Sequence, residues 1–338
     1  MTTKEIIALS QKYLMNTYAR LPMAPVKGKG SFLWDADGKK YLDFFSGLAV
    51  TNLGHADPHI LYAIAKQSTK LLHVSNLFYI ESQAHLAELL CENSFADKAF
   101  FCNSGAEANE GAVKLARKWG HQNKGPLSAE IITMEGSFHG RTLAMITATG
   151  QEKVKKGFEP LIPGFKQVPY GNIQAVREAI DEKTCAVLLE PVQGEGGVRV
   201  ASVNYFKELR ELCQKKKLLL IFDEVQTGIG RTGTLFAHEQ LGIVPDIMTL
   251  AKALAGGLPI GAMLARDFVA QTFVPGDHAA TFGGNPFVTS VACAVLETIL
   301  NDKILDKVKE STLYLRQKLE QLQKKFSFIK EVRGLGLL

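Results

Sequence analysis

The chain has 338 residues, of which 46% are hydrophobic and 22% are charged, so it can bury a large core and divide into two domains. Its net charge of +5 is dispersed, with no basic run longer than residues 215–217, which argues against a nucleic-acid partner. No apolar stretch approaches the roughly 18 residues of a membrane span, and the first residues lack a secretory signal pattern. Five cysteines without a CxxC pair favour reduced thiols in the cytoplasm and no metal site.

In chain order, short strand-like pieces come first, with a hairpin expected from 32–34 and 41–43. Helical periodicity then covers 59–72 and 82–94. Helices from Ala106, near Lys153 and over 204–216 next alternate with apolar strands at 99–103, 130–134, 186–190, 218–222, 246–250 and 261–265. After residue 285 two long helices follow, and the chain ends on a strand-like piece, 331–338.

Alternating strands and helices predict an α/β fold with a mostly parallel central sheet and helices on both faces. The change of pattern at residue 285 predicts a second, smaller α+β domain. We therefore expect an N-terminal segment at 1–52, a large domain at 53–285 and a small domain at 286–338.

The most informative stretch is the apolar run 218–222, which Asp223 and Glu224 follow directly. An apolar run without alternation is typical of a strand buried on both faces. Ligands of open α/β sheets bind at the carboxyl ends of the strands, so Asp223 is expected where a ligand would lie. A buried acid needs a partner that stabilises its charge.

Other strands are also followed by residues suited to binding. Ser104 and Glu107 fit a capping box, while Gly105 and Ala106 would let an anion reach the free amides of the helix that begins there. The simpler interpretation is a capped helix alone. Lys252 is the only charge between Asp246 and Arg266, and desolvation there would make its amine nucleophilic.

Two loops complete this set. In the first, Phe138 could stack on a planar ring and Arg141 could bind a carboxylate, although each could instead have a purely structural role. In the second, Glu190 ends a strand and Glu195 lies in the glycine-rich loop beyond it. A buried acid, an apolar-flanked lysine, a phosphate-ready helix and a stacking ring match the requirements of pyridoxal phosphate.

Together these segments resemble the fold-type I, class III pyridoxal-phosphate aminotransferases. The resemblance extends over essentially the whole chain and is carried by NTYARLP at 16–22, WDADGKKYLDFFSGLAVTNLGHADP at 34–58, NSGAEANE at 103–110, FHGRT at 138–142, EPVQGEGG at 190–197, FDEVQTGIGRTG at 222–233, the Lys252 segment and TFGGNP at 281–286.

This resemblance implies that Lys252 binds pyridoxal 5′-phosphate covalently and that Asp223 pairs with its pyridine nitrogen. Val225 would pack on the ring, Phe138 would stack on the opposite face and Gln226 would reach the phenolic oxygen.

Further cofactor contacts are implied for Glu224 and for the backbone of Gly105 and Ala106, which would bind the phosphate. Thr281 would reach the same phosphate from a partner subunit, so the resemblance implies a homodimer with shared active sites.

For the substrates, an amino acid and a 2-oxo acid, the resemblance implies that Arg141 binds the α-carboxylate. Glu195 would neutralise a second, C-terminal arginine that binds 2-oxoglutarate, and Ala280 and Tyr18 would lie near the donor. Family members usually have Gly-Ser where this chain has Ala279-Ala280. They also continue well beyond the position of Leu338, so the small domain is expected to be incomplete.

The resemblance implies transamination of N2-acetylornithine with 2-oxoglutarate, a step of arginine biosynthesis. Leu48 fits the enzymes of this family that act on N2-acetylornithine, because those that act on free ornithine have a tyrosine near that position. Ornithine, 4-aminobutyrate and succinyl-diaminopimelate also remain possible donors. A racemase or decarboxylase of the same class would fit these motifs too, as would an inactive chain that only binds the cofactor.

Overall fold

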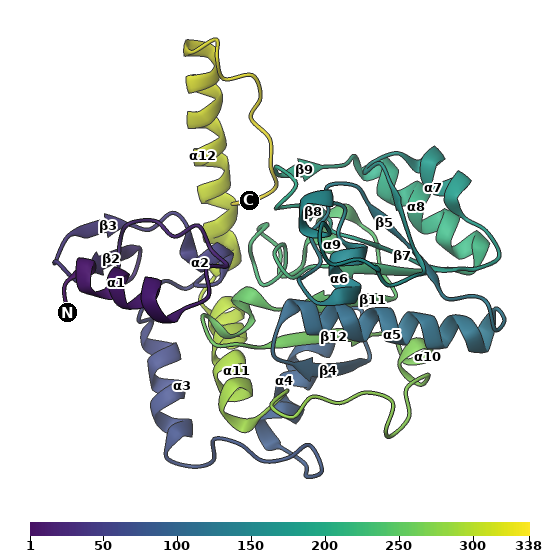
Figure 1. Ribbon diagram of the computed structural model, residues 1–338, viewed down its shortest axis with the longest axis horizontal. Coiled ribbons are helices and arrows are strands. Elements are labelled where there is room, and N and C mark those ends of the chain that lie inside the picture. Colours follow the sequence, from purple (N-terminus) through teal and green to yellow (C-terminus); the bar gives the residue numbers. More distant parts are fainter.

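The computed structural model describes all residues, 1–338 (Figure 1). Its centre is a seven-stranded sheet with the order β4-β12-β11-β10-β7-β5-β6. β12 is antiparallel to both of its neighbours, and the other paired strands are parallel. The predicted α/β fold with a mostly parallel sheet is therefore confirmed. The strands are β4 (Lys98–Cys102), β5 (Glu130–Met134), β6 (Phe165–Val168), β7 (Thr184–Leu189), β10 (Leu219–Asp223), β11 (Ile247–Leu250) and β12 (Gly261–Ala265).

Helices cover both faces of this sheet, as the apolar strands require. Along β10, Leu219 and Ile221 pack in one core with α5 (Gly105–Asn123). The alternate residues, Leu220 and Phe222, pack in a second core with α8 (Val203–Lys216). The remaining helices of this region are α6 (Leu143–Ala148), α7 (Ile173–Ala179), α9 (Ala237–Leu241), α10 (Asp267–Ala270) and the single 3-10 turns η1 (Glu152–Val154) and η2 (Lys252–Ala255).

The N-terminal segment contains α1 (Thr3–Tyr13), a small sheet and the short α2 (Ser46–Ala49). The predicted hairpin is present as β2 (Phe32–Asp35) and β3 (Lys40–Leu42), and β1 (Pro25–Lys29) adds a third strand. Asp35 holds the hairpin turn, because its carboxylate accepts bonds from the Asp37 and Lys39 amides and from the Tyr41 hydroxyl.

The two long C-terminal helices differ in their packing. α11 (Pro286–Asn301) packs on α3 (Pro58–Ser68) and α4 (Glu81–Glu92), and its apolar residues belong to the largest buried core. α12 (Ile304–Lys325) has no buried residue and projects from the body (Figure 1). The three-part division at residues 52 and 285 stays a prediction.

Two expectations about individual elements are wrong. The helix near Lys153 is only the turn η1, because proline and glycine follow it closely at Gly157 and Pro160. Residues 331–338 form no strand, since glycines at 334 and 336 adopt positive φ and turn the chain. No helix is long and apolar enough to cross a membrane.

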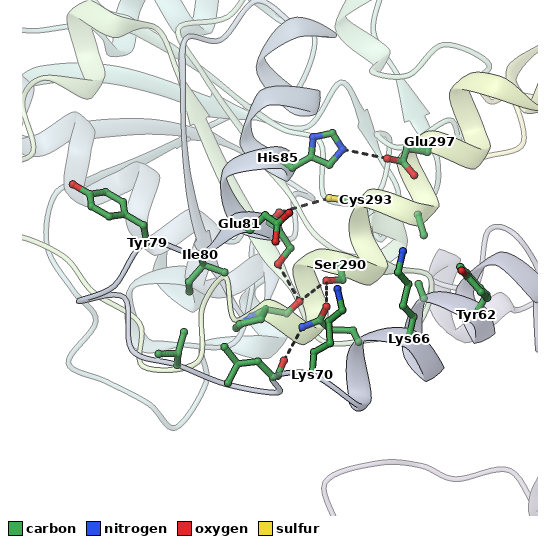
Figure 2. A pocket seen from close by; sticks show the side chains of 17 residues that line it. Tyr62, Lys66, Lys70, Tyr79, Ile80, Glu81, His85, Ser290, Cys293 and Glu297 are labelled. Carbon is green, nitrogen blue, oxygen red and sulfur yellow. Dashed lines mark hydrogen bonds and ion pairs between the residues drawn. The ribbon is translucent and has the colours of Figure 1, made fainter.

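A cavity of about 510 Å³ lies between α3, α4 and α11 (Figure 2). Several of its polar side chains pair with one another or with nearby backbone. His85 lies 3.2 Å from Glu297, and Ser290 donates to Gln67 over 3.1 Å. None of the residues that the sequence predicts at the cofactor site lines this cavity.

Candidate active site

A second cavity, of about 460 Å³, lies at the edge of the sheet where the parallel strands end. Segments following β4, β5, β7, β10 and β11 line it, together with residues 257–260 before the antiparallel β12 and Val50 of the N-terminal segment. The strand order brings these segments to one place, as expected at the carboxyl edge of an α/β sheet. Nine predicted residues lie there: Gly105, Ala106, Phe138, Arg141, Glu195, Asp223, Val225, Gln226 and Lys252.

Asp223 ends β10 at the floor of this cavity and is only 4% exposed. Its Oδ2 accepts a hydrogen bond from Asn109 over 2.7 Å and lies 2.8 Å from His139 Nδ1. Its Oδ1 accepts only the Val225 amide, at 3.1 Å. The carboxylate is thus fixed in orientation while Oδ1 retains capacity for another donor.

Asn109 was missed by the sequence analysis. It is 1% exposed, donates to Asp223 and to the His139 carbonyl, and accepts a bond from the Thr249 hydroxyl at 2.7 Å. Its position could have been anticipated, since it lies four residues after Gly105 and therefore on the same face of α5.

His139 was also given no role. Its ring is buried, its Nδ1 faces Asp223, and its Nε2 has no hydrogen-bond partner. A loop histidine beside a stacking phenylalanine gives no local signal of this contact. The pairing depends on how β5 and β10 are placed in the sheet.

Lys252 begins η2 with a φ of +44°. A non-glycine residue in this region costs about 1–3 kcal/mol and is found mainly at functional sites. Burial lowers the pKa of the Lys252 ammonium, and three carboxylates, led by Asp223, oppose part of that shift. The amine therefore loses its proton more readily than an exposed lysine does.

The start of α5 provides the amides of an anion site. The Ser104 hydroxyl accepts from the Glu107 amide at 3.2 Å, as predicted, but the Glu107 carboxylate returns to Asn103 rather than to Ser104. The first amides of a helix have no intrahelical partner, so those of Gly105 and Ala106 can bind a phosphate.

Gly105 also faces Val225, the residue predicted to pack on the cofactor ring. A Cβ at position 105 would lie 2.8 Å from Val225 Cγ1. We expect Gly105→Ala to displace Val225 and weaken cofactor affinity about tenfold, despite the roughly 1 kcal/mol of helix propensity that alanine adds. Titration of the apoenzyme with pyridoxal 5′-phosphate measures this, and unchanged affinity would show that Val225 does not contact the ring.

Phe138 and Arg141 lie together on the loop after β5. The Arg141 guanidinium carbon is 5.5 Å from the centre of the Phe138 ring. The Phe138 amide donates to Glu190 Oε2 over 3.0 Å. Glu190 is 6% exposed and also lines the cavity, so it anchors the loop that carries both predicted binding residues.

Burial, and then the negative charge of Asp223, raises the pKa of the Glu190 carboxyl well above its ordinary value. At a pH between the ordinary pKa of this carboxyl and its raised pKa, the folded protein therefore keeps a proton on Glu190 that the unfolded chain has released. Stability from this group is fully present below the ordinary value of 4.5 and is lost as pH rises through the raised value.

We accordingly expect Glu190→Gln to reduce the loss of stability on going from about pH 5 to about pH 8, because glutamine stays neutral at both. Urea unfolding of the apoprotein at the two pH values measures this. Glu178→Gln, at an exposed helical position, is the matched control and should leave the pH dependence as it is. Identical pH dependence in wild type and Glu190→Gln would contradict the raised pKa.

Glu195 and Gln226 come from two neighbouring loops that both line the cavity. A Cβ at Gly194 would lie 1.4 Å from Gln226 Oε1. Any larger residue at position 194 would therefore require the Gln226 side-chain amide to move from its present position.

Four predicted residues lie outside this cavity. Glu224 is turned away, because successive strand residues point to opposite sides, and it accepts the α9 amides of Ala237 and His238 at 2.6 and 2.8 Å. The structure therefore corrects its predicted cofactor contact to a helix-capping role. Thr281 and Ala280 line a different cavity, and Tyr18 is 71% exposed.

The cavity fits pyridoxal 5′-phosphate. It joins a desolvated amine, a buried carboxylate with a free acceptor, and the amides of a helix N-terminus. Lys252 would hold the aldehyde carbon, Asp223 the ring nitrogen and the start of α5 the phosphate.

Comparisons with known proteins agree with this assignment. The family described as aminotransferase class-III matches residues 13–338. Acetylornithine aminotransferase from Caldanaerobacter subterraneus is 53% identical, over 98% of this chain and 84% of that protein. The Methanocaldococcus jannaschii protein of the same name is 52% identical, over 100% of this chain and 85% of that protein.

Solved structures show the same similarity. Ornithine aminotransferase from Toxoplasma gondii superimposes with a TM-score of 0.96 at 36% identity, over 100% of this chain and 81% of that one. Acetylornithine aminotransferase from Elizabethkingia anophelis gives 0.88 at 37% identity, over 100% and 83%. A second Toxoplasma structure is described with pyridoxal phosphate at the active site. The predicted cofactor is confirmed with the family: this chain belongs to the class-III aminotransferases.

Proposed function

We propose that this chain catalyses transamination of N2-acetylornithine with 2-oxoglutarate, giving N-acetylglutamate 5-semialdehyde and glutamate, a step of arginine biosynthesis. The main support for this activity is that Lys252, Asp223 and Arg141 line the same cavity. The donor is supported by the acetylornithine aminotransferases that share about half of their residues with this chain.

When bound, the cofactor supplies a carbonyl for the donor amine and a ring that accepts electrons. Lys252 Nζ is then the base that moves the proton from the donor carbon, which its lowered pKa favours. Asp223, fixed by Asn109 and His139, keeps a proton on the ring nitrogen through its charge.

Arg141 lines the cavity beside Phe138 and would bind the α-carboxylate of the donor. Glu195, on a different loop, places a negative charge on the same cavity. A donor with one carboxylate and an uncharged acyl group would be favoured there over a dicarboxylate such as glutamate.

Free ornithine is the second candidate donor, favoured by the superposition on ornithine aminotransferases. Initial rates with N2-acetylornithine, ornithine, 4-aminobutyrate and succinyl-diaminopimelate, each with 2-oxoglutarate, decide between them. We expect the highest kcat/KM for N2-acetylornithine. A higher kcat/KM for another donor would identify that donor as the substrate in place of N2-acetylornithine. If none of the four donors yields glutamate, the chain does not transaminate any of them.

We also propose a homodimer with shared sites. Thr281, expected at the phosphate, lies outside the chain's own cavity. Leu77, Phe78 and Tyr79 form an exposed apolar run, in which Tyr79 extends outward (Figure 2), and such patches mark interfaces. Light scattering should give twice the mass of the chain, and a monomer with full activity would contradict the shared site.

The predicted cytoplasmic location is likewise a proposal. It is supported by five free cysteines, four of them buried, a pattern that suits a reducing compartment.

A further inference from the structure

The chain turns back after α12, which ends at Lys325, and its residues 331–338 pass β9 (Arg199–Val200) (Figure 1). Arg333 there makes three hydrogen bonds to a loop about 136 positions earlier in the chain. Its Nε donates to the carbonyls of Gly197 and Val198 at 3.0 and 3.2 Å, and its Nη2 donates to Gly197 at 2.7 Å.

The loop that Arg333 contacts carries Glu195 into the cavity. The short strands β8 (Val192–Gln193) and β9 (Arg199–Val200) bracket it. Within it Gly197 has a φ of +95° and Val198 a φ of +51°. A β-branched residue is rare in the left-handed region and persists there only when its surroundings hold it. Arg333 supplies that restraint.

The same C-terminal segment also contacts the loop after β10. The Leu337 amide donates to the Arg231 carbonyl at 3.1 Å. A Cβ at Gly336 would lie 2.4 Å from Thr232 Cα, so the backbone of the C-terminal segment packs directly against the backbone of this loop. Residues 333–338 therefore join the loop of Glu195 to the loop that begins with Val225 and Gln226.

We propose that Arg333 is a positioning residue that fixes the Glu195 loop and so sets the preference of the site between acyl-ornithine and dicarboxylic substrates. This inference rests on the proposed function of Glu195. A fixed carboxylate at the cavity repels the second carboxylate of glutamate, whereas a carboxylate on a loosened loop can turn toward solvent.

A simple surface ion pair would be a different explanation, since Arg333 also contacts Glu331 and its side chain is 45% exposed. The two explanations differ in what lysine can replace. A guanidinium donates to both carbonyls at once, while an ammonium keeps the charge without this planar fork. Lysine would thus preserve an ion pair but only partly restore the clamp.

The test compares Arg333→Ala and Arg333→Lys with Arg316→Ala, which removes an exposed arginine of α12 that pairs only with Glu320. The first readout is the ratio of kcat/KM for N2-acetylornithine to that for glutamate in the donor half-reaction. The second is amide hydrogen exchange of residues 194–200 in the cofactor-loaded enzyme.

For Arg333→Ala we expect the ratio to fall about tenfold, as loss of charge-assisted hydrogen bonds implies, together with faster exchange of the loop. Arg333→Lys should lie between this variant and wild type, and Arg316→Ala should match wild type. If Arg333→Ala does not fold, Arg333→Lys carries the test with the same two readouts.

Glu195→Gln distinguishes the role of the Glu195 charge from the role of Arg333 in holding its loop. If it leaves the donor ratio unchanged, the proposed role of Glu195 fails, whatever the loop exchange shows. If it shifts the ratio while the Arg333 variants keep wild-type ratio and exchange, the clamp is overturned. In the double variant of Arg333→Ala and Glu195→Gln, no shift beyond that of Glu195→Gln is expected, and an additive shift would contradict action through Glu195.

Discussion

Replacing Lys252 with alanine is expected to lower turnover at least about a thousandfold, because the base that moves the substrate proton is lost. The variant should also lose the cofactor adduct that borohydride fixes to the protein. Steady-state kinetics and peptide mass spectrometry after reduction measure the two effects.

Lys252→Arg tests whether a positive charge alone suffices, since a guanidinium stays protonated. It should be as inactive as the alanine variant. Lys153→Ala removes an exposed lysine and is the control that should retain wild-type turnover. A fixed adduct on a different lysine would show that Lys252 is not the site.

Replacing Asp223 is expected to reduce kcat about a hundredfold to a thousandfold, the range seen when a preorganised electrostatic contact is removed. Asp223→Asn is the sharper variant, because asparagine fills the same space and removes the charge, while one carboxylate oxygen becomes an amide NH2. Asp223→Ala would in addition leave Asn109 and His139 without their buried partner.

Asp246 offers a matched control for this experiment. It is a second buried acid, 5% exposed, but it precedes β11 and pairs with Arg210 and the Leu220 amide at 2.8 Å each. Asp246→Asn should lower the midpoint of thermal unfolding and leave kcat intact. Asp223→Asn should lower kcat and leave the midpoint of thermal unfolding close to that of the wild type. Wild-type kcat in Asp223→Asn would refute the role assigned to the carboxylate.

Local sequence was sufficient to predict every strand of the central sheet except β6, together with the residues that directly follow the predicted strands. A strand buried on both faces is an uninterrupted run of apolar residues in the sequence, and the first charged residue or glycine after the run marks its end. Asp223 and Lys252, 29 positions apart (252 − 223), could be placed at one sheet edge because parallel strands share their carboxyl edge.

Side-chain direction within a loop was less accessible. Adjacent acids, Asp223 and Glu224, look equivalent in sequence, yet one faces the cavity and the other caps α9. Residues 331–338 look like a strand, but their glycines turn the chain toward other loops.

The sequence by itself therefore determined the fold class, the cofactor and the residues at the ends of β4, β5, β10 and β11. Only the tertiary structure decided that Asn109 and His139 hold Asp223, that Glu190 anchors the Phe138 loop, and that Arg333 binds the loop of Glu195. The physical reason is that these contacts depend on strand order and on chain segments far apart in sequence, whereas local patterns report only burial and the period of a single element.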